Sequence, residues 1–181
     1  MKKFYGILFL LVIILVSSCD KPEEMLTTEK RKEEEQKIVT TIENYNKSNE
    51  TRDWYALVET LADEVVFFGT DSSEVITSFS EYKKAIEKQW QEYEKTIYSP
   101  LSDVSIQMDN AATFASIIYG HNVELTKAGV TENYYMRGAR ILKKEKNKWV
   151  IVSGIVGIVR TESDVNKEHI PTVPTIEPEK K

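Results

Sequence analysis

The sequence predicts an α+β domain in which one curved, mostly antiparallel sheet packs against three helices. Helical periodicity dominates from about residue 30 to residue 94, and long runs rich in β-branched and aromatic residues follow from residue 101 to residue 159. Helices followed by a meander of strands are typical of the α+β class. With 181 residues, 41% of them hydrophobic, the chain is long enough to build a single core.

The first two helices follow from apolar residues at helical spacing. The first is expected from about Glu29 to Lys47, with a buried face formed by Ile38, Val39, Ile42 and Tyr45. Thr51 is then a suitable N-cap for a second helix. The apolar residues of that helix fall at positions i, i+3, i+4 and i+7, which are Trp54, Leu57, Val58 and Leu61.

Two strands and a third helix are expected next. Residues 64–69 contain a β-branched and aromatic run closed by glycine, and residues 75–77 form a shorter strand. Ser78 and Glu81 form a capping box that opens a helix reaching about Glu94. The buried face of this helix is expected to contain Tyr82, Ala85, Ile86, Trp90 and Tyr93.

Four long strands complete the domain. They are expected at residues 101–108, 113–125, 131–143 and 149–159. Asp109-Asn110 and Lys146-Asn147 are suited to the hairpin turns between them. A curved sheet of such strands facing helices leaves a cone with an open mouth.

The start of the chain has the layout of a signal peptide. Two lysines precede an apolar run from residue 4 to residue 16, which is too short for a membrane-spanning helix of ~20 residues. The run ends in Val16-Ser17-Ser18-Cys19, which resembles the bacterial lipobox. That resemblance implies cleavage before Cys19 and acylation of this residue, which is the only cysteine in the chain.

The chain therefore divides into four segments. We expect a signal peptide at residues 1–18, a lipidated flexible tether at 19–29, the cone domain at 30–160 and a disordered, proline-rich tail at 161–181. The lipid would hold the protein in the cell envelope, on the periplasmic face of the outer or the inner membrane. Nucleic acid is not an expected partner, because the net charge is −5 and the lysines are mixed with acids.

Residues 30–160 resemble the nuclear-transport-factor-2-like superfamily, which includes SnoaL-like polyketide cyclases, ketosteroid isomerases and scytalone dehydratase. The resemblance rests on the element order and on residues 61–67, 68–74 and 148–152. By that resemblance the general-base aspartate of ketosteroid isomerases would fall on Gly69. Histidines that many SnoaL-like relatives place after the last tryptophan would fall on Ser153 and Ile155, with Gly157 beyond. Acid–base catalysis is therefore not evident from these positions.

Several other polar residues could still act in the cone. His121 is either a proton shuttle or a structural side chain, and Arg137 with Tyr135 could fix a carboxylate or carbonyl if that strand face points inward. Alternatively, Arg137 pairs with Asp71 or Glu74. Asp71 and Glu74 also suggest a calcium loop, but the regular ligand spacing is absent and a capped turn is the simpler interpretation.

No metal or other cofactor is expected, because the only histidines are His121 and His169, and His169 lies in the tail. Alternation along a strand separates its two faces but does not say which face points inward. The side chains expected to line the cone are Trp54, Phe67, Trp90, Tyr119, His121, Tyr135, Arg137 and Ser153.

The leading hypothesis is a non-catalytic, membrane-anchored lipoprotein whose cone binds a small apolar ligand or a partner. One alternative is a SnoaL-like cyclase, isomerase or hydrolase that acts on a small carbonyl compound through His121, Asp71 or Arg137. The other is a structural or interaction lipoprotein that forms a homodimer through the sheet. A large apolar patch on the outer sheet face would favour this last hypothesis.

Overall fold

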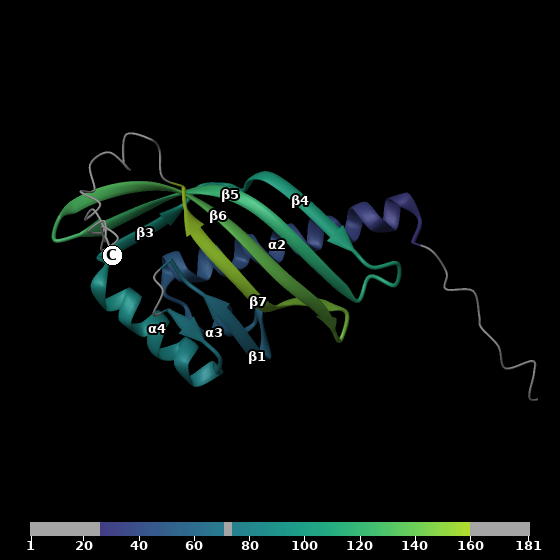
Figure 1. The fold of residues 1–181 in the computed structure, drawn as a ribbon, viewed down its shortest axis with the longest axis horizontal. Helices are drawn as coiled ribbons and strands as arrows, with labels where there is room; N and C mark the ends of the chain where they lie inside the picture. Colours follow the sequence, from purple (N-terminus) through teal and green to yellow (C-terminus); the bar gives the residue numbers. More distant parts are fainter. Residues whose placement is uncertain (1–25, 71–73, 160–181) are drawn as a thin grey trace, which may run out of the picture.

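A computed structural model describes residues 26–70 and 74–159, which form one curved sheet with helices along it (Figure 1). The α+β fold class expected from the sequence is confirmed. Cys19, Asp71, His169 and the expected signal peptide and tail lie outside the described residues. The described helices are α2 (Thr28–Thr51), α3 (Trp54–Val58) and α4 (Phe79–Glu92). The strands are β1 (Leu61–Phe68), β2 (Val75–Ile76), β3 (Lys95–Tyr98), β4 (Ser102–Met108), β5 (Phe114–Lys127), β6 (Val130–Glu145) and β7 (Lys148–Ile158).

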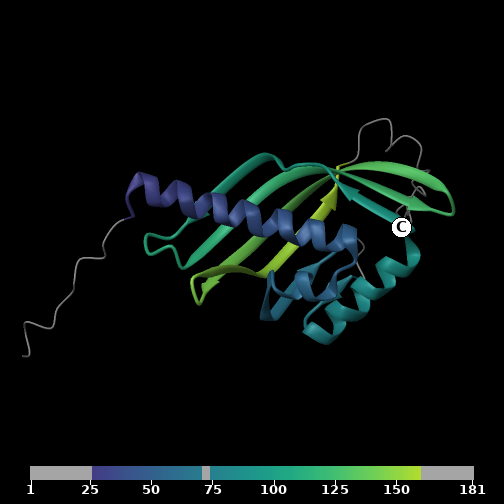
Figure 2. The same ribbon diagram turned by 180° about the vertical axis from the view of Figure 1, so that it is seen from behind.

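The strand order in the sheet is β2-β1-β7-β6-β5-β3, and β4 pairs with the same edge of β5 as β3 does. Among the described strands, β1 and β7 run parallel and the other pairs are antiparallel. The helices lie on one side of the sheet, and Figure 2 shows α2 crossing that side. We call this side the inner face and the opposite side the outer face.

The second helix begins later and is shorter than its periodicity predicts. Thr51 is the last residue of α2, not an N-cap, because Arg52 adopts a left-handed conformation with φ 55° and ends the helix. Asp53 is the N-cap of α3 and accepts a hydrogen bond from the Ala56 amide at 3.0 Å. Leu61 lies in β1 and not in a helix.

The capping box of the third helix is confirmed. Ser78 accepts from the Glu81 amide at 3.2 Å, and Glu81 accepts from the Thr77 amide at 2.9 Å. The helix ends at Glu92, before the predicted end, and β3 follows at once. This strand of four residues was not predicted, because it is too short to show an alternating pattern.

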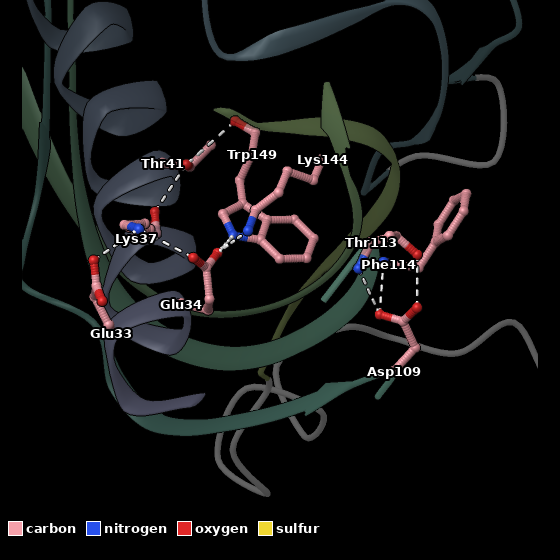
Figure 3. Close-up of polar contacts among 9 residues, drawn as sticks. All are labelled: Glu33, Glu34, Lys37, Thr41, Asp109, Thr113, Phe114, Lys144 and Trp149. Carbon is pink, nitrogen blue, oxygen red and sulfur yellow. Dashed lines mark hydrogen bonds and ion pairs between the residues drawn. The ribbon is translucent and has the colours of Figure 1, made fainter. Parts of the chain in front are cut away.

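The two predicted hairpin turns are present. Lys146 and Asn147 both have positive φ, 47° and 66°, and connect β6 to β7 as a two-residue turn. At the β4–β5 turn, Asp109 accepts from the amides of Thr113 and Phe114 at 2.7 and 2.9 Å (Figure 3).

A bulge in β7 decides which of its side chains face the helices. Ile141 pairs with Ser153, but the next residue of β6, Leu142, pairs with Ile151. Val152 is therefore the extra residue, and side-chain alternation changes phase there. Trp149 and Ile151 face inward before the bulge, whereas Gly154 faces inward after it. Ser153, Ile155 and Gly157 consequently lie on the outer face, and their expected place in the cone wall was wrong.

Glu34 fastens α2 to the β6–β7 hairpin. Its carboxylate accepts from the Trp149 indole at 2.7 Å and forms ion pairs with Lys144 at 2.5 Å and Lys37 at 3.0 Å (Figure 3). Burial alone would raise the pKa of Glu34, but the hydrogen bonds from Lys144, Lys37 and Trp149 outweigh it and lower the pKa to about 2. Glu34 is therefore a satisfied buried carboxylate that positions the helix.

Candidate functional site

Arg140 lies at the centre of the inner face of β6. Only 6% of the residue is exposed, and its guanidinium lies 5.2 Å from the ring centre of Phe67 and 5.7 Å from that of Tyr45. The register pairs Arg140 with Gly154, where a Cβ atom would lie 2.3 Å from Arg140 Nη1. Glycine at this position therefore makes room for the guanidinium.

The charge of Arg140 is unusual for a buried group. None of the ion pairs formed by residues 26–70 and 74–159 includes it. Its Nε atom is buried and has no hydrogen-bond partner within the described part of the chain. An arginine is not deprotonated in proteins, so the cone contains a fixed positive charge.

Tyrosines surround this cation. The Tyr82 hydroxyl donates to the Tyr45 hydroxyl at 3.0 Å, and Tyr119 packs over Gly138, where a Cβ would lie 2.6 Å from the Tyr119 ring. Burial raises the pKa of Tyr82 and Tyr119. These phenols are therefore neutral at physiological pH and cannot balance the charge of Arg140.

His121 is buried beside the tyrosines. Its Nδ1 accepts a hydrogen bond from the Asn46 side-chain amide at 3.3 Å, and its ring stacks on Tyr98 with centroids 5.4 Å apart. Burial and the nearby charge of Arg140 lower the pKa of His121 to about 4. The imidazole is neutral at pH 7 and too weak a base to exchange protons readily there.

The structure brings part of the predicted set together around Arg140. Phe67 contacts the guanidinium, and Tyr119 meets His121 edge to face at 5.3 Å. Trp90 packs against the core with a buried indole Nε1 that has no hydrogen-bond partner among the described residues. Trp54 meets Phe79 edge to face with centroids 5.8 Å apart, and Lys83 Nζ lies 5.3 Å from the centre of its ring.

Tyr135 and Arg137 are on the outer face, and the inward orientation expected for them was wrong. They pair with Asn122 and Gly120 of β5, whereas the buried side chains beside these two belong to Tyr119, His121 and Val123, which point to the other face. The Tyr135 hydroxyl donates to Asp103 at 2.7 Å, and Arg137 is exposed. Arg140, three residues beyond Arg137, is the guanidinium that enters the cone. The sequence contains this alternative, because residues of opposite parity point to opposite faces of a strand.

Two side chains of the enzyme hypothesis, those of His121 and Arg137, are not brought together by the fold. His121 lies inside the cone and Arg137 outside it, so these two side chains do not converge. Glu74 closes a local turn: it accepts from the Thr70 amide at 2.8 Å, and its own carbonyl accepts from the Gly69 amide at 2.9 Å. Within residues 26–70 and 74–159, no cluster of three potential metal ligands occurs.

The outer face bears two rows of residues that cross four strands, which we call the apolar rows after their large apolar side chains; the second row also contains Ser153 and Ser116. The register aligns Phe68, Ile155, Ala139 and Ile118 in one row, and Val66, Ser153, Ile141 and Ser116 in the next. The five large apolar side chains in these rows are between 38% and 56% exposed. We call this surface the outer patch. Contiguous exposed apolar surface of this kind marks interaction sites.

Two surface hollows lie away from Arg140 and from the outer patch. One, of about 400 Å³, is bordered by α2 and β4 at residues that include Val39, Val104 and Ile106. The other, of about 560 Å³, lies between α2, α3 and the start of β7, near Ser48 and Thr60. Neither contains a side chain that the sequence predicted for the cone.

Comparison with known proteins agrees with this fold. The family model of the SnoaL-like domain matches residues 38–156. The chain therefore belongs to the SnoaL-like family. The sequence matches no curated protein. None of the helices within the described residues is long and apolar enough to cross a membrane.

Solved structures extend the likeness to the nuclear-transport-factor-2-like fold. A candidate scytalone dehydratase from Novosphingobium aromaticivorans is 13% identical, with a TM-score of 0.67 over 74% of this chain and 89% of its own. A candidate dehydratase of the nuclear-transport-factor-2-like family from Streptomyces avermitilis is 11% identical, with a TM-score of 0.64 over 72% of this chain and 99% of its own. The CaMKII hub of S. rosetta is 15% identical, with a TM-score of 0.59 over 68% and 95%. At these identities the likeness concerns the fold alone.

Proposed function

We propose that this protein is a lipid-anchored interaction module of the cell envelope that forms a homodimer through the outer patch and performs no catalysis of its own. The observation that carries the proposal is the pair of apolar rows formed by residues of β1, β7, β6 and β5. A two-fold dimer would place the same rows of two copies against each other, with polar neighbours such as Arg137 at the rim.

The outer patch contributes a favourable energy of the right order. Burying the exposed half of a large apolar side chain contributes about 1 kcal/mol, so ten such side chains in a dimer contribute on the order of 10 kcal/mol. Association costs ~4–15 kcal/mol in lost freedom, so the dimer is expected to be of moderate affinity.

The anchor proposed at Cys19 fits an association of this strength. Two or three acyl chains hold a protein permanently at a membrane, and confinement to one surface raises the effective concentration of each copy for the other. The anchor is tested by Cys19→Ala: this variant should leave the membrane fraction and lose incorporation of labelled palmitate. Retention in the membrane fraction without label would refute the anchor.

The absence of catalysis is proposed from the chemistry of the cone. Its central groups are a permanently charged arginine, neutral phenols and a histidine whose pKa is lowered to about 4. General acid–base catalysis works best with groups whose pKa lies near the working pH. This set is better suited to holding a polar group than to moving protons at pH 7.

Sedimentation equilibrium tests the dimer directly. The mature chain, residues 19–181 with Cys19→Ser, should give a dimer mass at tens of micromolar. Ile118→Lys with Ile155→Lys should weaken association by at least about 100-fold, because each charge is buried twice in a symmetric interface. The control Val130→Lys replaces an exposed apolar residue at the start of β6, outside the rows, and should dimerise normally. A monomeric wild type, or equal weakening by the control, would refute the proposal.

A further inference from the structure

We infer that residues 170–176, which we call the tail segment, fold back over the outer patch of the same chain and compete there with a second copy. The inference rests on the proposed function in one respect: the surface that the tail segment covers is the one through which we propose the dimer forms. The tail segment follows the described part of the chain, which ends at residue 159. Its sequence and the register of the sheet carry the argument.

The first argument is a repeat in the tail segment. Its sequence is Ile-Pro-Thr-Val-Pro-Thr-Ile, with aliphatic residues at positions 170, 173 and 176. Proline fixes its own φ at about −65° and disfavours the helical region for the residue before it, so this sequence favours the polyproline II conformation. That conformation has about three residues per turn, which places Ile170, Val173 and Ile176 on one side, ~9.3 Å apart.

The second argument is the spacing of the outer patch. The second apolar row alternates large and small side chains across the strands. Val66 and Ile141 are large and exposed, Ser153 lies between them, and Ser116 lies beyond Ile141. Neighbouring strands lie ~4.8 Å apart, so the alternation repeats every ~9.6 Å. A polyproline II segment that crosses the strands can therefore place successive aliphatic side chains over the two serines.

The third argument is reach. β7 ends at Ile158, and the Val159 amide still donates to the Tyr135 carbonyl of β6 at 2.9 Å. Returning from residue 160 to the row that contains Ile155 takes about 16 Å, the length of five strand residues. Residues 160–169 can span up to ~33 Å when extended. The tail segment can therefore reach the outer patch of its own chain.

The fourth argument is charge beside the apolar rows. Arg137 is exposed and lies between Gly157 and Gly120, in the register row next to the first apolar row. It takes part in none of the ion pairs within residues 26–70 and 74–159. Carboxylates flank the tail segment on both sides, at Glu168 and Glu177. Pairing of one of them with Arg137 would fix the register of the tail segment more than it would add affinity.

Covering by the tail segment weakens dimerisation without preventing it. A dimer needs two uncovered patches, so its apparent dissociation constant rises as the inverse square of the uncovered fraction. If the tail segment covers the patch in about two thirds of the molecules, association is about tenfold weaker than it would be without covering. Release of the tail segment therefore favours the dimer.

Sedimentation equilibrium of the mature chain with Cys19→Ser measures this competition. The triple variant Ile170→Ser, Val173→Ser and Ile176→Ser keeps the prolines and the carboxylates, and should tighten the dimer by about tenfold. The control Val165→Ser removes an aliphatic side chain that precedes the tail segment and should leave the dimer as in the wild type. An unchanged or weaker dimer in the triple variant would overturn the inference.

Cross-linking within one molecule tests the contact itself and needs no dimer. In the Cys19→Ser background at low micromolar concentration, Ala139→Cys with Val173→Cys should form a bis-maleimide bridge inside one chain. The bridge should form several times faster than that of Tyr55→Cys with Val173→Cys, since Tyr55 belongs to α3, on the helix side of the sheet.

Equal rates for the two pairs, or bridges between copies only, would overturn the inference. The dimer and the covering fail separately. A monomeric wild type that forms the bridge refutes the proposed dimer and supports the covering, whereas a dimeric wild type without the bridge refutes the covering alone.

Discussion

Glu34 provides the most quantitative prediction. Its pKa is lowered from 4.5 to about 2 in the folded chain, which corresponds to about 3 kcal/mol of stability from the ionised form. Gln at this position keeps the acceptor for the Trp149 indole but removes the charge that pairs with Lys37 and Lys144. Glu34→Gln should therefore lower the free energy of unfolding by about 3 kcal/mol at pH 7.

The loss should depend on pH with a definite sign. Because the folded pKa is depressed, the contribution of Glu34 is fully present above its unfolded pKa and disappears as the pH falls through the folded value. At pH 3 the difference between wild type and Glu34→Gln should shrink to about 1.5 kcal/mol. Urea unfolding followed by tryptophan fluorescence at pH 7 and pH 3 measures both differences.

Glu33→Gln is the matched control. Glu33 lies on the same helix and pairs with the same Lys37 at 3.0 Å, but its side chain is 66% exposed. Exposed pairs contribute between 0 and about 1 kcal/mol, so this variant should be nearly as stable as the wild type. A loss below about 1 kcal/mol for Glu34→Gln at pH 7, or an equal loss at both pH values, would refute the account of this network.

Three further predictions concern single residues. The His121 imidazole should titrate near pH 4 by NMR. Because the buried site favours the neutral ring, its contribution to the free energy of unfolding should be fully present above pH 6.5 and be lost as the pH falls toward 4. Titration near pH 6.5 would contradict the lowering of the pKa by burial. Ser78→Ala should cost about 1 kcal/mol of unfolding free energy in a urea titration through loss of the cap, whereas exposed Ser80→Ala should not. Gly154→Ala should destabilise the fold by ~1–3 kcal/mol, because its Cβ would meet Arg140 and the Ala139 carbonyl. A Cβ at Gly157 meets nothing within 4 Å, so Gly157→Ala should be nearly neutral. Thermal unfolding of the two variants measures the difference.

The order of the elements could be predicted from the sequence because most of them carry a local signal. The capping box at Ser78 and the Lys146-Asn147 turn are settled by residues a few positions apart. The predicted second helix was too long, because the apolar residues from Trp54 to Leu61 keep helical spacing beyond the end of α3 at Val58. The left-handed turn at Arg52 and the start of β1 at Leu61 depend on packing that the spacing does not contain.

The site was predicted less well, for a reason specific to sheets. One extra residue in a strand reverses the face of every residue after it, and the bulge at Val152 did this to β7. In β6, two arginines of opposite parity stand three residues apart, and alternation alone does not say which is inside. The buried neighbours of Arg140, above all Gly154 across the strand pair, resolve the choice.

Site-specific cross-linking reports directly on association through the outer patch. Cys19 is the only natural cysteine, so Cys19→Ser gives a background without thiols. Ala139→Cys places one thiol in the middle of the first apolar row, and Tyr55→Cys places one at an 84% exposed residue of α3. Facing sheets pack about 10 Å apart, within reach of a short bis-maleimide. Ala139→Cys should give a covalent dimer and Tyr55→Cys should give none. No dimer for Ala139→Cys, or equal yields from both positions, would contradict association through this surface.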